Sequence, residues 1–212
     1  MSFVVALLGA ESTGKTTLAQ SLARALRGEG RSVGLVGEYL REFCDSRGRT
    51  PRQDEQAGIA EEQTRRIAQA AREHDIVIAD TSALMIAVYS ELVFGDTSLY
   101  ARAEAAHREA SRLTLLTALD LPWQHDGLQR DGPHVREPVD ALVRAALVRA
   151  QVSWSVVFGT GAARDDAALA SIRRALAPPA GDLDTRNARW HWHCERCGDA
   201  ACEQHRLPLM PR

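Results

Sequence analysis

The segment from Gly9 to Thr16 constrains the fold of this chain more than any other stretch of the sequence. It reads GAESTGKT, with a lysine and a hydroxyl residue directly after the second glycine. The apolar run FVVALL precedes it, and the helical pattern TLAQSLARAL follows it. A strand, a glycine-rich turn and a helix in this order form a phosphate-binding loop, because the glycines let successive N–H groups turn inward at the helix N-terminus. The segment therefore predicts a P-loop NTPase of the α/β class.

The chemistry of the loop predicts a site for ATP and Mg²⁺. Lys15 is expected to reach the β- and γ-phosphates and to act in catalysis, and the Thr16 hydroxyl is expected to coordinate Mg²⁺. Lys15 is the single lysine of the chain, at a position where a compact ammonium fits and a planar guanidinium does not. The predicted nucleotide-binding residues are Gly9, Glu11, Ser12, Thr13, Gly14, Lys15, Thr16 and Thr17.

Five short apolar runs alternate with amphipathic stretches along the chain. These runs are interpreted as strands buried on both faces, and they cover residues 3–8, 32–37, 75–80, 112–119 and 153–159. The alternation predicts a parallel sheet of about five strands with helices on both faces. We expect a kinase-type domain over residues 1–177, with a lid-like loop at 120–136, followed by a tail over residues 178–212.

Asp80 ends the apolar run IVIAD and is a predicted catalytic and metal-binding residue. A carboxylate at the carboxyl end of a buried strand, beside the phosphate loop, is typical of the acidic residue that helps to hold Mg²⁺. An alternative interpretation is a helix N-cap, because Asp80, Thr81 and Ser82 precede the helical pattern ALMIAVYSEL. Both roles can hold at once.

Glu38 and Arg41 follow the second predicted strand and should lie beside the γ-phosphate. A carboxylate there can accept the proton of an attacking hydroxyl, and an arginine can stabilise phosphate charge. The alternative is a solvated charge pair at the start of a surface helix. With one lysine in the chain, already used in the loop, the guanine-reading motif N-K-x-D cannot occur. This excludes the switch GTPases and favours a small-molecule kinase.

Bulk properties argue against two classes of partner. A net charge of −2 gives no electrostatic footprint for nucleic acid. No apolar run approaches the ~20 residues that span a bilayer, and the start of the chain has no basic region or cleavage pattern. We therefore expect a cytoplasmic enzyme with a small-molecule partner, and the sequence leaves its oligomeric state open.

Several segments together resemble the ribosylnicotinamide kinase domain of NadR-type bacterial proteins, over roughly residues 2–158. They are GAESTGKTTL, GEYLREF, the IAEEQ stretch that follows Asp54, IVIADTSALMIAVYSELVFG and LTALDLPWQHDGLQR. The resemblance implies a deoxynucleoside-kinase-like architecture and transfer of the ATP γ-phosphate to the ribose 5′-hydroxyl of nicotinamide riboside. NadR-type proteins also carry an N-terminal adenylyltransferase domain, whose activity is not expected here because the chain begins at the phosphate-loop strand.

The same resemblance implies positions for the acceptor site and the lid. Acceptor-site residues would be Glu38, Tyr39 and Arg41, and lid residues covering the nucleoside would be Asp120, Trp123 and Asp126. Trp123 offers a flat face on which a cationic nicotinamide ring can stack, although it can instead be an apolar plug after Pro122.

The lid also carries charged side chains that fit its expected role. Asp120 and Asp126 can accept hydrogen bonds from ribose hydroxyls or balance the positive charge of the nicotinamide ring. Arg130, a candidate catalytic residue, and Arg136 can clamp phosphates when the lid closes. Two alternatives to the leading hypothesis remain: a P-loop kinase for another nucleoside or metabolite, and an NTP-binding regulatory ATPase module.

The tail contains a cluster with the spacing C-x2-C-x4-C-x2-H. In a cytosolic protein such a cluster suggests a metal rather than a disulfide, and these side chains can form a tetrahedral zinc site. The candidate ligands are Cys194, Cys197, Cys202 and His205, with His191 or His193 as possible replacements for His205. The alternative is a terminal tail with free thiols.

Overall fold

Five parallel strands form the centre of the protein in a computed structural model that describes residues 2–124 and 132–177. The strands are β1 (Phe3–Leu8), β2 (Val33–Val36), β3 (Ile76–Asp80), β4 (Ser111–Thr117) and β5 (Trp154–Val157). They are ordered β2-β3-β1-β4-β5 in one sheet, and every neighbouring pair is parallel. The predicted P-loop α/β fold is confirmed.

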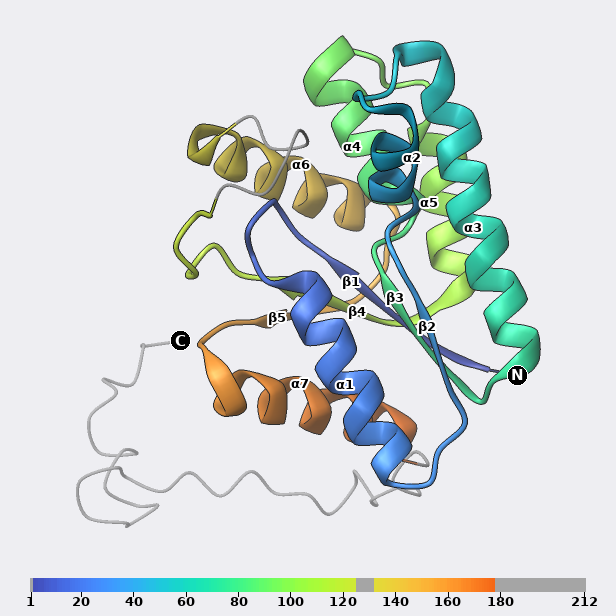
Figure 1. Ribbon diagram of the computed structural model, residues 1–212, viewed down its shortest axis with the longest axis vertical. Coiled ribbons are helices and arrows are strands. Elements are labelled where there is room, and N and C mark those ends of the chain that lie inside the picture. The colour runs from blue at the N-terminus through green and yellow to red at the C-terminus, as the bar shows by residue number, and fades with distance from the viewer. Residues whose placement is uncertain (1, 125–131, 178–212) are drawn as a thin grey trace, which may run out of the picture. The chain divides into compact units, whose positions relative to one another are not determined.

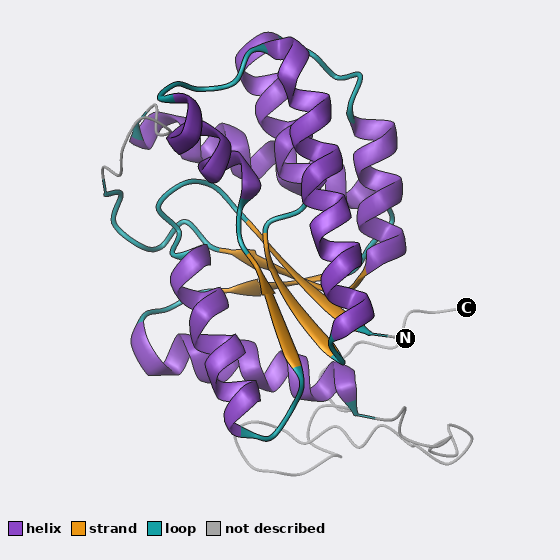
Figure 2. Cartoon of the chain, turned by 45° about the vertical axis from the view of Figure 1, so that its right-hand side comes forward, coloured by secondary structure: helices purple, strands orange, loops and turns teal. Residues whose placement is uncertain are grey.

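Helices cover both faces of this sheet, as Figures 1 and 2 show. They are α1 (Lys15–Gly28), α2 (Tyr39–Arg47), α3 (Gln56–Glu73), α4 (Ala83–Phe94), α5 (Tyr100–Ala110), α6 (Arg136–Arg149) and α7 (Gly161–Leu176). Helices α1 and α7 bury their apolar faces against one side of the sheet through residues such as Leu22 and Ile172. Helices α3, α4 and α6 pack on the other side through Ile67, Leu84 and Val139. Burial of both faces is what holds a parallel sheet together.

The two edge strands are less buried than the sequence predicted. Leu35 in β2 is 38% exposed and Val156 in β5 is 40% exposed. The interpretation of all five runs as strands buried on both faces is therefore wrong at the edges, because side chains at the edge of a sheet are covered by fewer neighbouring residues. The central strand β1 fits the prediction, since every residue from Val4 to Leu8 is buried.

The predicted loop at 120–136 is shorter than expected at its carboxyl end. A turn of 3-10 helix covers Pro133–Val135, and α6 begins at Arg136. Proline is favoured in the first helical turn because its missing N–H would have no partner there. Residues 125–131 lie outside the described part of the chain. Among the described residues, no helix has the length and apolar character needed to cross a bilayer.

Strand order determines where a ligand can bind. The chain leaves the central strand β1 toward β2 and β3 on one side and reaches β4 and β5 on the other. At this reversal a crevice opens outside the carboxyl ends of the strands, which is the usual ligand position in open α/β sheets. The phosphate loop follows β1 at this place.

Candidate active site

The loop between β1 and α1 has the backbone geometry of a phosphate cradle. Gly9 has φ 144° and Gly14 has φ 73°, and Ser12 between them has φ 54°. These conformations favour glycine, because a side chain at such torsions is strained. At Gly9 the space is also closed, since a Cβ atom there would lie 2.1 Å from Thr117 Oγ1 at the end of β4.

Lys15 lies across the loop that it follows. Its Nζ donates hydrogen bonds of 2.8 Å to the carbonyl oxygens of Gly9 and Ala10. The ammonium is therefore held over the concave side of the cradle, where the phosphates of a nucleotide would bind.

Thr16 and Asp80 meet at the carboxyl ends of β1 and β3. Thr16 Oγ1 donates a hydrogen bond of 2.6 Å to Asp80 Oδ2, while Asp80 Oδ1 is buried and has no hydrogen-bond partner. Asp80 as a whole is 3% exposed. A buried carboxylate oxygen without a donor fits a site that receives the water of a hydrated Mg²⁺ ion, and the hydroxyl of Thr16 can bind such an ion directly. The two residues therefore fit the predicted metal.

The N-cap alternative for Asp80 is wrong. The N-cap of α4 is Ser82, whose Oγ accepts a 3.3 Å hydrogen bond from the N–H of Leu84. Thr81, between the two, has φ 88°, which is rare for a β-branched residue and marks a strained turn beside the site.

A buried histidine, His107, contacts the turn between β3 and α4. His107 of α5 is 2% exposed, and its Nδ1 lies 3.0 Å from Ser82 Oγ. Its Nε2 lies 2.9 Å from Thr114 Oγ1 in β4. Burial lowers the pKa of His107 to about 4, because the charged form loses its hydration. The imidazole is therefore neutral at neutral pH and anchors the segment that follows Asp80.

Two residues that the sequence analysis missed hold the phosphate loop in place. Thr117 Oγ1 donates to the carbonyl of Leu8 at 3.1 Å and lies 2.7 Å from Thr13 Oγ1. Arg164 of α7 is 5% exposed, and its Nη2 donates a 2.6 Å hydrogen bond to the carbonyl of Thr13. Burial lowers the pKa of this guanidinium. A sequence signal for Arg164 did exist. It follows the last strand and the glycine-containing run FGTGAA, at the edge of the sheet where ligands usually bind.

Asp120 makes contacts that belong to the same support, and its predicted role in binding ribose stays a prediction. Its Oδ2 accepts a hydrogen bond from the N–H of Gly159, and its Oδ1 lies 3.6 Å from Nη1 of Arg164. Arg164 also donates to the Gly159 carbonyl at 3.1 Å. Asp120 and Arg164 thus fasten the turn after β5 next to the phosphate loop.

A cavity of about 390 Å³ adjoins the phosphate loop and is named here the acceptor cavity. The phosphate-loop side contributes Glu11, Ser12 and Lys15 to its lining. Its other walls consist of Glu38, Leu40, Arg41, Cys44, Thr50, Pro51, Arg52, Gln53, Gln56, Tyr89, Val93 and Phe94. Burial raises the pKa of the Cys44 thiol, which keeps it neutral. Glu38 and Arg41 both line this cavity, with Arg41 Nη2 3.8 Å from Glu38 Oε2, and their roles beside the γ-phosphate stay predictions.

Tyr39 does not line this cavity. Its N–H donates a 2.8 Å hydrogen bond to Gln63 Oε1, and the guanidinium of Arg66 lies 4.4 Å from the centre of its ring. The tyrosine ring lies on the side of α2 that faces α3. The sequence alone did not show this, because it does not fix how α2 is rotated about its axis.

A second and larger cavity, about 800 Å³, lies over the other side of the phosphate loop and is named the nucleotide cavity. It is lined by Ser12, Gly14, Thr16, Thr17, Leu18, Gln20, Arg41, Leu121, Pro122, Gln124, Thr160, Gly161, Arg164 and Asp165. Ser12 and Arg41 line both cavities. The two spaces therefore meet at the phosphate loop.

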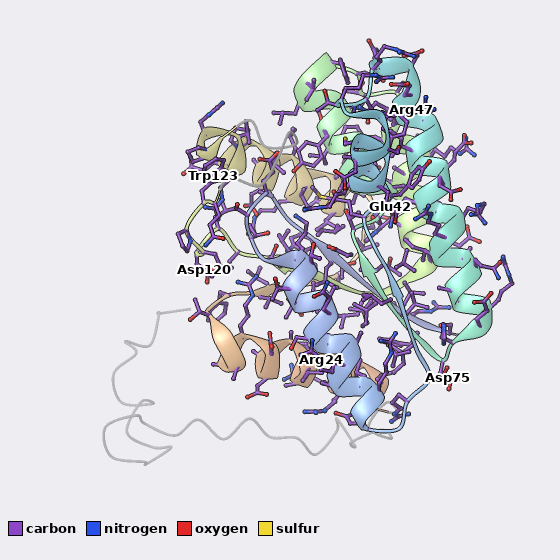
Figure 3. All side chains as sticks on the ribbon, viewed as in Figure 1. Arg24, Glu42, Arg47, Asp75, Asp120 and Trp123 are labelled. Carbon is purple, nitrogen blue, oxygen red and sulfur yellow. The ribbon has the colours of Figure 1, made fainter. Side chains whose placement is uncertain are left out.

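The start of the predicted lid is fastened to the phosphate loop. Ser12 Oγ donates to the carbonyl of Gln124 at 2.7 Å, and the Gln124 N–H donates back to Ser12 Oγ at 2.9 Å. Figure 3 labels Asp120 and Trp123 at the left of the view, on the segment that follows β4. Trp123 is partly buried but is not among the residues that line either cavity.

The remaining predicted residues divide into two groups. Arg136 is the first residue of α6 and is buried, with Nε and Nη2 lacking hydrogen-bond partners. The others lie outside the described residues, so their roles stay predictions: Asp126 and Arg130 of the lid, and Cys194, Cys197, Cys202 and His205 of the suggested zinc cluster.

Comparisons with known proteins agree with this architecture. A family model described as an AAA domain matches residues 4–164. A crystal structure of NadR protein in complex with NAD and AMP-PNP is similar with a TM-score of 0.64 and 21% identity, covering 82% of this chain and 49% of that chain. A structure of NadR protein in complex with NR is similar with a TM-score of 0.64 and 20% identity, with the same coverage. This chain thus spans about half the length of those proteins. No curated protein matches the sequence.

Proposed function

We propose that this chain, which belongs to the family described as an AAA domain, is an ATP- and Mg²⁺-dependent kinase that phosphorylates a nucleoside. Its proposed acceptor is nicotinamide riboside. Two comparisons support the choice of ligands, since similar NadR structures hold AMP-PNP in one case and NR in the other. The reaction is transfer of the γ-phosphate of ATP to the ribose 5′-hydroxyl.

The observation that carries this proposal is the junction of the two cavities. Ser12 and Arg41 line both, and Lys15 lines the acceptor cavity while its Nζ bonds to the phosphate loop. A triphosphate wrapped by that loop would end where the acceptor cavity begins. Phosphoryl transfer needs this arrangement, because catalysis consists mainly of positioning the two reactants and stabilising charge between them. An enzyme that only hydrolyses ATP needs no second cavity at that point.

Each side chain at the junction has a specific task in this scheme. Lys15 and Arg41 would stabilise the charge of the phosphoryl group as it passes between the reactants. Thr16 and Asp80 would hold Mg²⁺, which when bound neutralises charge on the phosphate oxygens. The side chain of Glu38 is 15% exposed and lies beside the half-exposed Arg41. Its carboxylate can accept the proton of the attacking hydroxyl.

Transfer of labelled γ-phosphate from ATP to nicotinamide riboside tests the proposal directly. We expect a phosphorylated riboside with the wild-type protein and none with Lys15→Ala, because the ammonium contacts the transferring group. Arg24→Ala is the matched control, since Arg24 is an exposed cation on the same helix, labelled in Figure 3, and lines neither cavity. It should transfer phosphate at the wild-type rate.

The role of Glu38 is tested separately. Glu38→Gln should lower kcat by about 100-fold or more, as expected for loss of a general base, with little change in the KM for ATP. Wild-type protein that hydrolyses ATP slowly and transfers phosphate to no nucleoside would instead support an NTP-binding regulatory module.

A further inference from the structure

Gln56, the first residue of α3, has a buried amide oxygen without a hydrogen-bond partner. The residue is 4% exposed, its Oε1 is unpaired, and its side chain lines the acceptor cavity. An unpaired polar atom inside a protein destabilises the folded state and needs an explanation in each case. One explanation is a ligand that brings the missing donor.

A second glutamine on the same helix shows what a structural role looks like. Gln63 is fully buried at 0% exposure. Its Oε1 accepts from the N–H of Tyr39 at 2.8 Å, and its Nε2 donates to the carbonyl of Gly37 at 3.2 Å. Both ends of the Gln63 amide therefore connect α3 to the segment after β2. Gln56 has the same side chain and similar burial, but its oxygen makes no such connection.

The other walls of the cavity indicate what kind of molecule would reach Gln56. Leu40, Val93 and Phe94 supply apolar surface, and Tyr89 supplies a ring. Such walls suit a flat ring, and a small number of polar groups among them fixes its orientation. The Oε1 atom of Gln56 is an acceptor, so it would select a ring substituent that carries an N–H donor.

We propose that Gln56 determines the specificity of the acceptor cavity by accepting a hydrogen bond from an N–H group on the base of the nucleoside. The substrate class is a nucleoside whose ring bears a primary amide or an amino group. This inference rests on the proposed kinase function and deepens it, since it identifies the group on the substrate that the protein reads.

Two ribosides that differ only in the donor provide the test. Nicotinamide riboside carries a CO–NH₂ group, and 3-acetylpyridine riboside carries CO–CH₃ of nearly the same shape. Wild-type protein should favour the amide by about tenfold or more in kcat/KM, because the methyl ketone leaves Oε1 unpaired. Equal use of both ribosides would overturn the inference and leave the kinase function intact. Transfer to neither would overturn both.

Two variants identify the atom responsible. Gln56→Met removes the polar group at similar length, so the ratio of kcat/KM for the two ribosides should fall to about one. Gln56→Glu keeps an acceptor and removes the donor, so the preference for the amide should persist. Loss of preference in Gln56→Glu would mean that an acceptor atom at this position does not read the N–H group of the substrate, and would overturn the assignment.

Thermal stability separates this role from a structural one. Gln56→Met should have a Tm equal to or above that of the wild type, because it removes an unpaired buried atom. Gln63→Met should have a lower Tm, because it leaves the N–H of Tyr39 and the carbonyl of Gly37 without their partner. If Gln56→Met lowers the Tm as much as Gln63→Met does, Gln56 is a structural residue and the inference fails.

Discussion

Thr16 Oγ1 donates a 2.6 Å hydrogen bond to Asp80 Oδ2, although the two residues are 64 positions apart in the sequence. This bond joins the first turn of α1 to the end of β3 and leaves Asp80 Oδ1 buried without a partner. The pair fits a magnesium site in which one residue binds the ion and the other orients its water.

Asp80→Asn should weaken the response to Mg²⁺ and leave the fold intact. We expect activity to fall by about 10- to 100-fold, as is typical when an outer partner of a metal site is lost, with partial recovery at high Mg²⁺. Turnover measured across a Mg²⁺ titration checks this. Asp75→Asn is the control, because Asp75 is exposed just before the other end of the same strand, as Figure 3 shows. A parallel loss in both variants would contradict the assignment.

Arg164→Met should reduce both stability and ATP binding. The guanidinium donates to the carbonyls of Thr13 and Gly159 from a buried position, so its loss should cost about 3 kcal/mol of unfolding free energy. The KM for ATP should rise, because the phosphate loop loses a support. Denaturant unfolding and ATP titration measure the two effects. Arg173→Met on the same helix removes only an exposed ion pair with Glu29 and should change stability by less than about 0.5 kcal/mol.

Gly9→Ala should disrupt the phosphate loop. The new Cβ would lie 2.1 Å from Thr117 Oγ1 and would sit on a residue with φ 144°. Overpacking and backbone strain together predict a loss of about 3 kcal/mol or more and no measurable nucleotide binding. Gly28→Ala provides the contrast, since a Cβ at that helical position meets nothing within 4 Å. Its stability should equal or slightly exceed that of the wild type. A well-folded Gly9→Ala protein that binds ATP normally would contradict the geometry.

His107 should make the protein sensitive to mild acid. Its pKa is about 4 in the folded protein, below the value of 6.5 for an exposed histidine. The unfolded chain therefore binds more protons between these values, and stability is lost as the pH falls from about 6.5 toward 4. Between pH 7 and pH 4.5 the loss from this residue should be about 2 kcal/mol.

The matching variant for this pH effect is His107→Gln. It should be less stable than the wild type at pH 7, because Ser82 and Thr114 lose the imidazole between them. Its stability should change less between pH 7 and pH 4.5 than that of the wild type. Replacing the exposed His134 with Gln should leave the wild-type pH profile unchanged. Identical profiles for wild type and His107→Gln would show that other groups cause the acid sensitivity.

The parts of this protein that were predictable from sequence are those in which local pattern and chain topology agree. The phosphate loop needs glycines at two positions and a strand and a helix around them, all of which are contiguous in the sequence. The meeting of Thr16 with Asp80 followed from one further rule, because the carboxyl ends of parallel strands lie at one edge of a sheet. Glu38 and Arg41 follow a neighbouring strand and reached the acceptor cavity for the same reason.

Other features depend on how a helix is rotated about its axis and on contacts between distant segments. The pattern of a single sequence does not show either. Tyr39 is adjacent to Glu38, but the orientation of α2 directs its ring toward Arg66 and away from the cavity. The sequence did not show that Asp120 contacts Gly159 and Arg164 after β5, and its predicted role in binding ribose stays a prediction. Gln56 had no motif around it, and only the folded protein shows an unpaired atom there.

Ser12 and Arg41, which line both cavities, have a consequence for the order and strength of ligand binding. A ligand that moves a shared wall changes the affinity of the neighbouring space, so the two binding equilibria are thermodynamically linked. Linkage is reciprocal: whatever factor ATP imposes on the dissociation constant of the nucleoside, the nucleoside imposes on that of ATP.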